Sequence, residues 1–331
     1  MTAEWVVSSM AVLVGGLGYI GSQVAKDLLE RGEHVIGIEN CFSTDPVAVR
    51  RLVKDYGLDL VPGTVVSRQV LRQALRRDDI DRIYWLAAQA SGHPEAAPAR
   101  YTETTNLIGP RMMLDAAGEY GIETVVFASS LKVYGPYLST DVDETTPYGQ
   151  FTDLAHLSHC YVEKLLEMCA SRHQLRCLAV RLGIVYGLGP VVKRDERFMT
   201  APNKFCQQAV RGQPLTITPS GAQLQGFIHI TDASRAMLSA PELAPSVGFT
   251  AVNAVTEITS PLAIAKAVQS AAAERGWSVP VIAPEVPPAT GNIRVRSKLE
   301  TLGFEPTQQI RSVLPAMLDF FARIEAQEVK S

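Results

Sequence analysis

The first half of the chain alternates short apolar runs with stretches whose apolar residues recur at helical spacing. Apolar runs of strand length lie at residues 10–16, 33–40, 82–88, 124–130 and 176–187. Residues 22–32 and 107–121 instead place their apolar side chains on one helical face. Strands and helices that alternate in this way predict βαβ units, and therefore a parallel sheet covered on both faces.

The regular alternation stops after Gly187. Proline and glycine become frequent there, and helical periodicity returns clearly only in the tail, at residues 312–326. This change predicts a second, smaller lobe of mixed structure behind the parallel sheet.

Composition narrows the classes of function. Hydrophobic residues make up 47% and charged residues 20% of the 331 positions, as in ordinary globular proteins. The net charge is −3 and no Lys/Arg-rich run occurs, so we expect no nucleic-acid partner. No apolar run approaches the roughly 20 residues of a membrane span, so we expect no membrane association. Five cysteines without a CxxC pair, and no targeting signal, predict a cytoplasmic protein with reduced thiols.

A glycine turn follows the first predicted strand. Gly15, Gly18 and Gly21 have the spacing of a turn in which the first glycine permits a tight bend, the second lets a pyrophosphate approach the backbone, and the third lets helix pack on strand. The helix that follows would offer free N–H groups to that anion. Glu39 ends the next strand, where a carboxylate accepts hydrogen bonds from ribose hydroxyls. Asn40, not arginine, follows it, which favours NAD over NADP.

Four segments in order carry a family resemblance: "GGLGYIG", "WLAAQAS", "FASSLKVYG" and "RLGIVYG". With them the chain resembles the extended short-chain dehydrogenases/reductases, the NAD-dependent epimerase/dehydratase family. Segments 203–232 and 296–306 extend the likeness over nearly the whole chain. Within the family, "HLS", "NKFCQQAVRGQPLT" and "AVNAVTEITS" are most similar to UDP-sulfoquinovose synthases.

The resemblance implies a Rossmann-type, doubly wound α/β fold with two lobes. The NAD-binding lobe would comprise residues 1–182 and 227–256, and a smaller substrate-binding lobe residues 183–226 and 257–331. Members mostly act on nucleotide-linked sugars: they oxidise a ring carbon with bound NAD, use the acidified neighbouring C–H, and often return the hydride. They usually form homodimers, through the helices near 106–120 and 153–170.

The resemblance also implies sets of contact residues. The expected cofactor contacts are Gly15, Gly18, Tyr19, Ile20, Gly21, Glu39, Asn40, Leu86, Ala87, Ala88, Gln89, Asn106, Ser129 and His159. The expected substrate contacts are Ser91, Tyr134, Asn203, Lys204, Gln223 and Gln225.

The family's catalytic pair is missing from this chain. Members carry a tyrosine and, four residues later, a lysine, about 25 residues after a Ser/Thr that corresponds to Ser130. Counting on from Ser130 places Ala155 at the tyrosine position and His159 at the lysine position. None of the ten tyrosines has a lysine four residues later. Alanine transfers no proton, and a histidine near its ordinary pKa is a mostly neutral substitute for a permanent cation.

Lys132 is our candidate replacement, because some dehydratases of the family place an acid/base group at this strand end. It needs a lowered pKa, which burial or a nearby cation would provide. Ser130 would polarise a substrate oxygen, and His159 would contact the ribose or relay protons. His156 is expected on the helix surface. It lies three residues before His159 and near Cys160, but no third ligand recurs at a zinc-site spacing, so we expect no metal.

Two further departures from the family pattern affect the residues expected to contact the ligand's phosphates and the cofactor's adenine. The family's G-x-Q-x-R segment, whose arginine contacts the nucleotide diphosphate, reads Gly221 to Gln225 here, so a neutral amide replaces the guanidinium. Lys204 would partly compensate. A Gly-Asp pair near the adenine appears as Gly63-Thr64.

Three functions therefore stay open. The first is an atypical NAD-dependent epimerase/dehydratase of a sugar or nucleotide-sugar that uses Lys132 as acid/base. The second is a non-redox lyase, cyclase or isomerase of a small metabolite. The third is a degenerate NAD-binding pseudoenzyme or scaffold.

Overall fold

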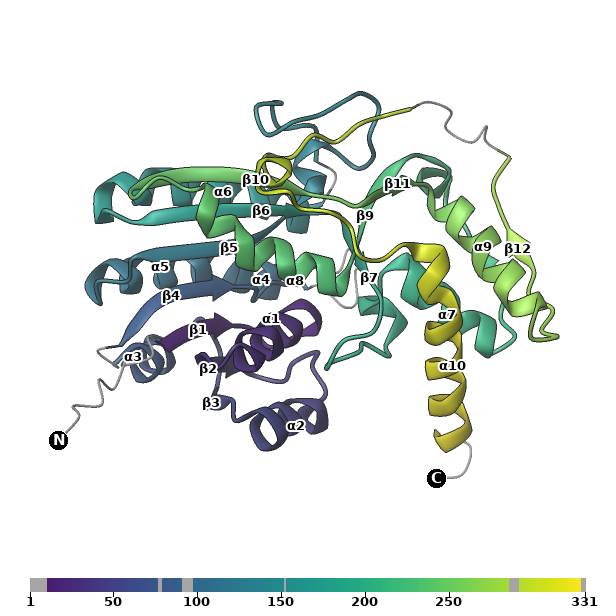
Figure 1. The fold of residues 1–331 in the computed structure, drawn as a ribbon, viewed down its shortest axis with the longest axis horizontal. Helices are drawn as coiled ribbons and strands as arrows, with labels where there is room; N and C mark the ends of the chain where they lie inside the picture. The colour runs from purple at the N-terminus through teal and green to yellow at the C-terminus, as the bar shows by residue number, and fades with distance from the viewer. Residues whose placement is uncertain (1–10, 77–78, 91–97, 152, 286–291, 329–331) are drawn as a thin grey trace.

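A seven-stranded parallel sheet forms the larger part of the molecule, and a smaller lobe lies at one end of it (Figure 1). The computed structural model describes residues 11–76, 79–90, 98–151, 153–285 and 292–328. The strands are β1 (Ala11–Gly15), β2 (His34–Glu39), β3 (Asp59–Pro62), β4 (Ile80–Trp85), β5 (Thr124–Ser130), β6 (Arg176–Leu182), β7 (Ile184–Tyr186), β8 (Leu215–Thr216), β9 (Gln225–His229), β10 (Gly248–Ala254), β11 (Glu257–Thr259) and β12 (Val281–Ile282). The α-helices are α1 (Tyr19–Glu30), α2 (Pro46–Tyr56), α3 (Arg68–Leu75), α4 (Ala99–Glu103), α5 (Gly109–Glu119), α6 (Leu154–His173), α7 (Ala201–Val210), α8 (Ile230–Ser239), α9 (Pro261–Ala273) and α10 (Ile310–Glu328).

The large sheet has the order β10-β6-β5-β4-β1-β2-β3, and every neighbouring pair in it is parallel. The direction in which strands are added reverses beside β1, between β4 and β2. Ligands of such sheets bind outside the carboxyl ends of the strands at this switch point. The doubly wound parallel sheet predicted from the sequence is confirmed.

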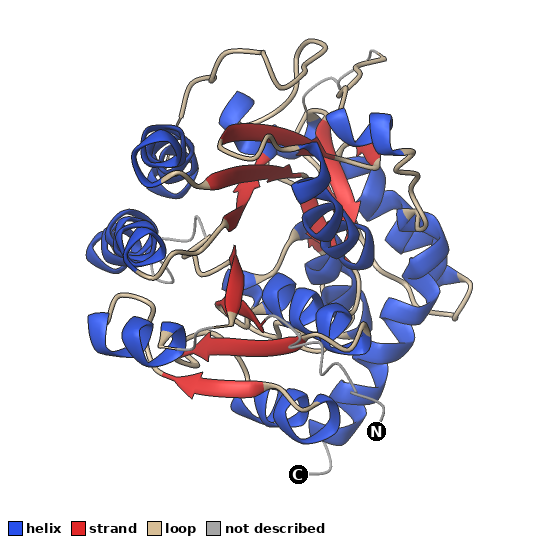
Figure 2. Cartoon of the chain, turned by 60° about the vertical axis from the view of Figure 1, so that its left-hand side comes forward, coloured by secondary structure: helices blue, strands red, loops and turns tan. Residues whose placement is uncertain are grey.

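Helices cover both faces of this sheet (Figure 2), which explains why its central strand β1 is apolar throughout. In β1, Val12 and Val14 point into a core shared with α1 and α8, whereas Ala11 and Leu13 point into a core shared with α3, α5 and α6. All four side chains are fully buried. The side chains of β1 therefore pack against helices on both faces of the sheet.

The predicted strand at 176–187 is two strands. β6 belongs to the large sheet, while β7 pairs with β9 in a separate sheet of order β11-β9-β7. The chain turns between them at Gly183, where a Cβ atom would lie 2.9 Å from the carbonyl oxygen of Gly226. This close backbone approach requires a glycine, and it is where the chain crosses into the smaller lobe. The expected lobe boundary at residue 227 falls inside β9.

The smaller lobe packs α7, α9 and α10 around its own apolar core, which includes Phe205, Ile264 and Phe321. Its helices contact mainly one another, and the lobe lies beyond the ends of the strands of the large sheet (Figure 1). Among the described helices, none is both long and apolar enough to cross a membrane.

Candidate active site

One cavity of about 690 Å³ lies between the carboxyl ends of the large sheet and the smaller lobe. That volume falls in the range of small-molecule and cofactor sites. Three groups of side chains line it: the glycine turn with the ends of β2 and β4, the end of β5 with the first turns of α6, and the segment from Lys193 to Phe205 with Gln225.

The glycine turn presents an uncapped helix start to the cavity. Gly16, not Gly15, takes the left-handed conformation (φ 93°), and a Cβ there would lie 2.7 Å from the backbone of Ala87. Gly18 is the N-cap residue of α1 and provides no side-chain cap, so the first N–H groups of α1 are free for an anion. A Cβ at Gly21 would lie 1.9 Å from the Gly16 carbonyl oxygen, so only glycine fits.

Glu39 joins this turn to the end of β2. Its carboxylate accepts hydrogen bonds from the backbone N–H groups of Leu17 (2.9 Å), Asn40 (3.0 Å) and Cys41 (2.7 Å). The side chain is buried, yet it lines the cavity, and a carboxylate has lone pairs left to accept ribose hydroxyls. The open helix start and this carboxylate fit a dinucleotide.

The first turns of α6 form the opposite wall. Asp153 caps the helix: its Oδ1 accepts from the N–H of His156 at 2.8 Å. Ala155 is buried and does not line the cavity. His159 lines it, and its Nδ1 has no hydrogen-bond partner among the described residues. Burial, and to a smaller extent His156, lowers the pKa of His159 to about 4, so its imidazole is neutral at physiological pH.

Lys132 approaches the cavity from the short helix Leu131–Tyr134, directly after β5. Its ammonium group donates to the carbonyl oxygen of Pro136 and, at 2.9 Å, to Oε1 of Gln225. Burial lowers its pKa to about 8, and the charge of Asp153 only partly opposes that shift. Ser130 also lines the cavity, and its Oγ accepts from the N–H of Lys132 at 3.2 Å.

His156 lines the cavity. From the sequence it is expected on the helix surface, without assignment to a site. Its Nδ1 is 2.5 Å from Oδ2 of Asp153, and the ring is about one-third exposed. One carboxylate thus holds both the backbone N–H and the ring of the same histidine.

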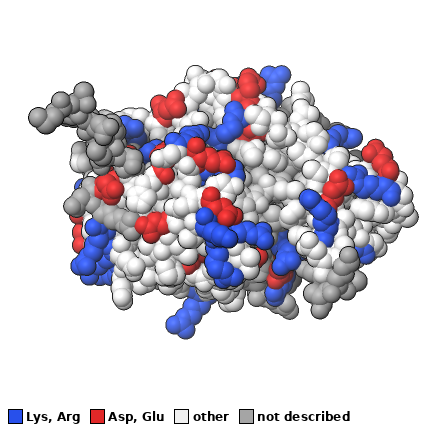
Figure 3. All heavy atoms as spheres, turned by 60° about the horizontal axis from the view of Figure 1, so that its bottom comes forward, with Lys and Arg blue, Asp and Glu red and all other residues white. Residues whose placement is uncertain are grey.

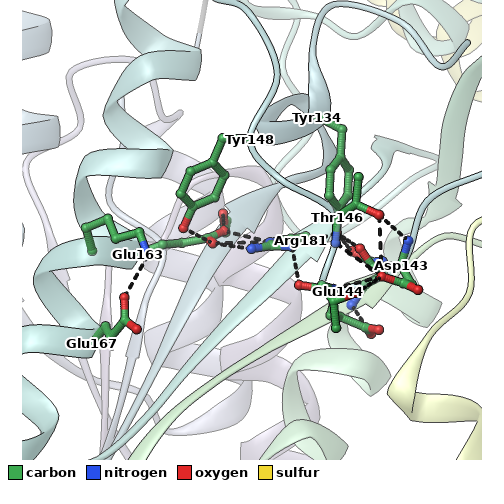
Figure 4. A network of polar contacts seen from close by, with 12 residues as sticks. Tyr134, Asp143, Glu144, Thr146, Tyr148, Glu163, Glu167 and Arg181 are labelled. Atoms are coloured by element: carbon green, nitrogen blue, oxygen red, sulfur yellow. Dashed lines mark hydrogen bonds and ion pairs between the residues drawn. The ribbon is translucent and has the colours of Figure 1, made fainter. Parts of the chain in front are cut away.

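A buried polar network supports the wall behind these groups (Figure 4). Glu163 of α6 pairs with Arg181 of β6 at 2.7 Å, and both are almost fully buried. Glu163 also accepts from Ser129 Oγ (2.6 Å) and from the Tyr148 hydroxyl (3.0 Å). Arg181 donates to the Tyr134 hydroxyl at 2.6 Å. Neither of these two tyrosines lines the cavity.

The cavity brings together most of the residues singled out from the sequence. Those that line it are Gly18, Tyr19, Ile20, Gly21, Glu39, Asn40, Leu86, Ala87, Ala88, Ser129, Ser130, Lys132, His159, Asn203, Lys204 and Gln225. Those that do not line it are Gly15, Gln89, Asn106, Tyr134 and Gln223. Ser91 lies outside the described residues.

Gly15, Asn106 and Tyr134 each have a structural reason for lying outside the cavity wall. Gly15 ends β1 against the Trp85 ring. Asn106 bridges the chain after β4 to α6: its amide accepts from the N–H of Gln89 at 2.7 Å and donates to Ser158 Oγ at 3.0 Å. The hydroxyl of Tyr134 donates to Oδ1 of Asn253 and accepts from Arg181, within the buried polar network behind the cavity wall.

Three residues that line the cavity were not singled out from the sequence, because no motif marks them: Lys193, Phe42 and Tyr101. Lys193 is half-buried, and among the described residues its ammonium has no carboxylate partner; it lies 5.8 Å from the centre of the Phe198 ring. By contrast Lys204, our predicted phosphate contact, pairs with Glu196 at 3.3 Å. Phe42 and Tyr101 stack at 4.2 Å where the cavity opens.

On the face seen in Figure 3, the charged side chains of the described residues form no patch of a single sign. Lys and Arg are interspersed there with Asp and Glu. Within the described ranges, no three His, Cys, Asp or Glu side chains are grouped as metal ligands would be.

Comparisons with known proteins agree with this geometry. A sequence model of the NAD dependent epimerase/dehydratase family matches residues 11–248. The UDP-glucose 4-epimerase of Erwinia amylovora is 28% identical over 261 residues, which cover 74% of this chain and 77% of the relative. UDP-glucuronic acid decarboxylase 4 of Arabidopsis thaliana is 28% identical over 319 residues, which cover 95% and 69%. A crystal structure of UDP-glucose 4-epimerase from Brucella ovis in complex with NAD, at 25% identity, superposes with a TM-score of 0.79 and covers 95% of this chain and 98% of that one.

Proposed function

This chain belongs to the NAD-dependent epimerase/dehydratase family, and we propose that it is an atypical member that acts on a sugar or nucleotide-sugar and uses Lys132, rather than a tyrosine, as acid/base. The names of its relatives, which act on UDP-linked sugars, support this substrate class. The specific likeness to UDP-sulfoquinovose synthases stays a prediction.

NAD is the cofactor that the residues of the cavity fit. The free N–H groups at the start of α1 would hold the pyrophosphate, and Glu39 would accept hydrogen bonds from the adenosine ribose hydroxyls. The ring of His159, which lines the cavity, would contact the nicotinamide ribose. Bound NAD supplies the acceptor and donor of hydride.

One observation carries the assignment of Lys132. Its ammonium lies in the cavity wall two residues from Ser130, and burial lowers its pKa to about 8. An acid/base group works best with a pKa near the operating pH, and an ordinary lysine lies far above it. Lys132 can therefore exchange a proton with the substrate, while the Ser130 hydroxyl polarises a substrate oxygen.

The test compares Lys132→Ala with Lys54→Ala, a change at an exposed lysine of α2. Thermal shift would establish binding of NAD, UDP-glucose and UDP-glucuronic acid, and product analysis would measure turnover. We expect Lys132→Ala to fold and to bind NAD but to lose turnover by about 100-fold or more. Turnover close to that of the wild type would remove Lys132 from the mechanism.

A non-redox lyase, cyclase or isomerase is the second candidate. It is favoured by the replacement of the expected lysine by a buried, neutral histidine at 159, which leaves the nicotinamide end of the cavity without its usual cation. A transient nicotinamide absorbance change on adding substrate would rule it out. Binding of NAD with no turnover of any sugar nucleotide would instead support a pseudoenzyme or scaffold.

We further propose that the protein is a homodimer through α5 and α6. Leu157, Tyr161 and Met168 follow one outward face of α6, and all three are exposed. Ile108, at the start of α5, is exposed as well, and the two helices contact each other. An exposed apolar stripe of this kind is typical of an interface.

A further inference from the structure

The first turn of α6 holds a carboxylate and an imidazole that the proposed mechanism has not used. Asp153 contacts His156 twice: Oδ1 accepts from the backbone N–H at 2.8 Å, and Oδ2 lies 2.5 Å from Nδ1. An Nδ1–H that donates to this carboxylate leaves the lone pair of the neutral ring on Nε2. Among the described residues, Nε2 has no hydrogen-bond partner, and the ring lines the cavity.

From this geometry we infer that His156 is a second acid/base residue of the site, positioned by Asp153, and that it takes the hydroxyl proton of the sugar when the hydride departs. The inference rests on the proposed function and deepens it by dividing the proton transfers between His156 and Lys132.

The place of His156 supports this role. It follows Ala155, the position at which relatives of this chain are expected to carry the proton-abstracting tyrosine, so it extends from the same helical turn. Lys132 is less available for the hydroxyl proton, because its ammonium already donates to Pro136 and Gln225. Among the described residues, Nε2 of the imidazole has no such partner and stays available to a substrate.

An ordinary helix cap would explain the backbone contact but not the second one. An N-cap carboxylate needs only the N–H of the third helical residue. Here the same carboxylate also fixes the orientation of a ring that faces a ligand cavity, as the third member of a nucleophile–base–carboxylate arrangement does. The side chains of Asp153 and His156 are each about 30% exposed, so the imidazole can meet a substrate.

The titratable groups around His156 are few. On α6 they are Asp153 and the neutral His159, and Lys132, from the short helix that contacts α6, senses the charge of Asp153. Lys193 and Glu196 line the cavity from the smaller lobe. None of these groups brings a second carboxylate into contact with the imidazole ring of His156.

The proposed step balances. The substrate C–OH loses its hydroxyl proton to Nε2 of His156, and the C–H bond of the same carbon breaks with its electron pair leaving as hydride. The alcohol would thereby become a ketone, and bound NAD would supply the hydride acceptor that this balance requires. Imidazolium then returns the proton when the hydride is returned.

The first experiment follows formation of reduced nicotinamide in a single turnover with UDP-glucose and with UDP-glucuronic acid. His156→Ala is expected to slow it by about 100-fold or more, with little change in the substrate concentration needed for half-saturation. Added imidazole is expected to restore part of the rate, which a purely structural role would not allow. Asp153→Asn keeps a good helix cap but loses the fixed tautomer, and should be slowed as well. A His156→Ala rate within about threefold of the wild type, or no rescue by imidazole, overturns the inference.

The second experiment needs no turnover. Diethyl pyrocarbonate labelling, read by mass spectrometry, would compare His156 with His34, which also lies near a carboxylate (Asp59, 3.8 Å) but outside the cavity. NAD with UDP-glucose should shield His156 and not His34. Equal labelling with and without these ligands overturns the inference. If thermal shift shows NAD but no sugar nucleotide binding, and His156 is nevertheless shielded, the proposed substrate class fails while the placement of His156 stands.

Discussion

Lys132 and His159 show what burial does to single ionisable residues in this cavity. The sequence places a lysine where a base is needed and a histidine where a cation is usual. Burial disfavours the charged form of both, so the pKa of Lys132 falls to about 8 and that of His159 to about 4. The same physical effect makes the lysine useful as an acid/base group and keeps the histidine neutral.

The amide of Gln225 preserves the lowered pKa of Lys132. It accepts a hydrogen bond from the ammonium without adding a negative charge. A Gln225→Glu change would add one, and we expect the pKa of Lys132 to rise by about one unit or more. The pH dependence of Lys132 acetylation, measured by mass spectrometry, tests this. Gln213→Glu, the same change at an exposed position outside the cavity, should leave it unmoved.

His159 should make the protein sensitive to acid. Its pKa is lowered in the fold, from 6.5 to about 4, so between these values the unfolded chain binds a proton that the folded chain does not. The free energy of unfolding therefore falls as pH drops through this window, by about 3 kcal/mol in all. In His159→Gln this part of the fall should be absent. Urea unfolding at neutral pH and near pH 4 measures it; equal pH dependence in both proteins would contradict the burial argument.

At the scale of elements, α6 combines two tasks. Its first turns present His156 and His159 to the cavity, with Asp153 in contact with His156. One turn further, Glu163 fastens the helix to Arg181 of β6 (Figure 4). The buried ion pair sets the orientation of the helix against the sheet, and so the position of the groups at its start.

Removing one partner of the Glu163–Arg181 pair should lower the free energy of unfolding considerably. Glu163→Gln leaves the buried Arg181 guanidinium without its carboxylate, and we expect the free energy of unfolding to fall by about 3–5 kcal/mol. Glu167→Gln, one turn later, removes an exposed pair with Lys164 and should cost about 0.5 kcal/mol or less. Glu163→Leu combined with Arg181→Met should cost less than Glu163→Gln alone. Denaturant unfolding of all three variants checks the order.

At the scale of the whole molecule, the cavity exists only because the chain crosses between its two parts. Tyr19, from the glycine turn, donates to the carbonyl oxygen of Gly187 at 2.7 Å, just after β7. Asn203 of α7 binds the same carbonyl oxygen at 2.9 Å. These contacts hold the smaller lobe against the glycine turn, so that residues more than 180 positions apart line one site.

The proposed dimer gives a test at this scale. Tyr161→Glu with Met168→Glu puts two charges on the exposed apolar face of α6, and burying them at an interface would be costly. We expect light scattering to show the mass of a dimer for the wild type and of a monomer for this variant. Val247→Glu with Ile282→Glu, at other exposed apolar positions, should leave the mass unchanged. Equal masses for all three proteins would exclude this interface.

The sequence by itself determined the sheet, the glycine turn and the absence of a tyrosine–lysine pair. These features depend on residues close together in the chain. A run of apolar residues forms a central strand buried on both faces, as in β1. Only glycine fits at position 21, because a Cβ there would clash with the carbonyl oxygen of Gly16. The sequence also singled out Lys132 and His159, and both line the cavity. Tertiary structure alone decided what those groups face. Gln225 holds Lys132, although 93 residues separate them, and Tyr134 turns away into the network around Arg181. The Asp153–His156 contact is local, since three residues separate the pair. That the ring lines a ligand cavity is not local, because residues of the smaller lobe form part of the same cavity, and no local pattern specifies such a long-range arrangement.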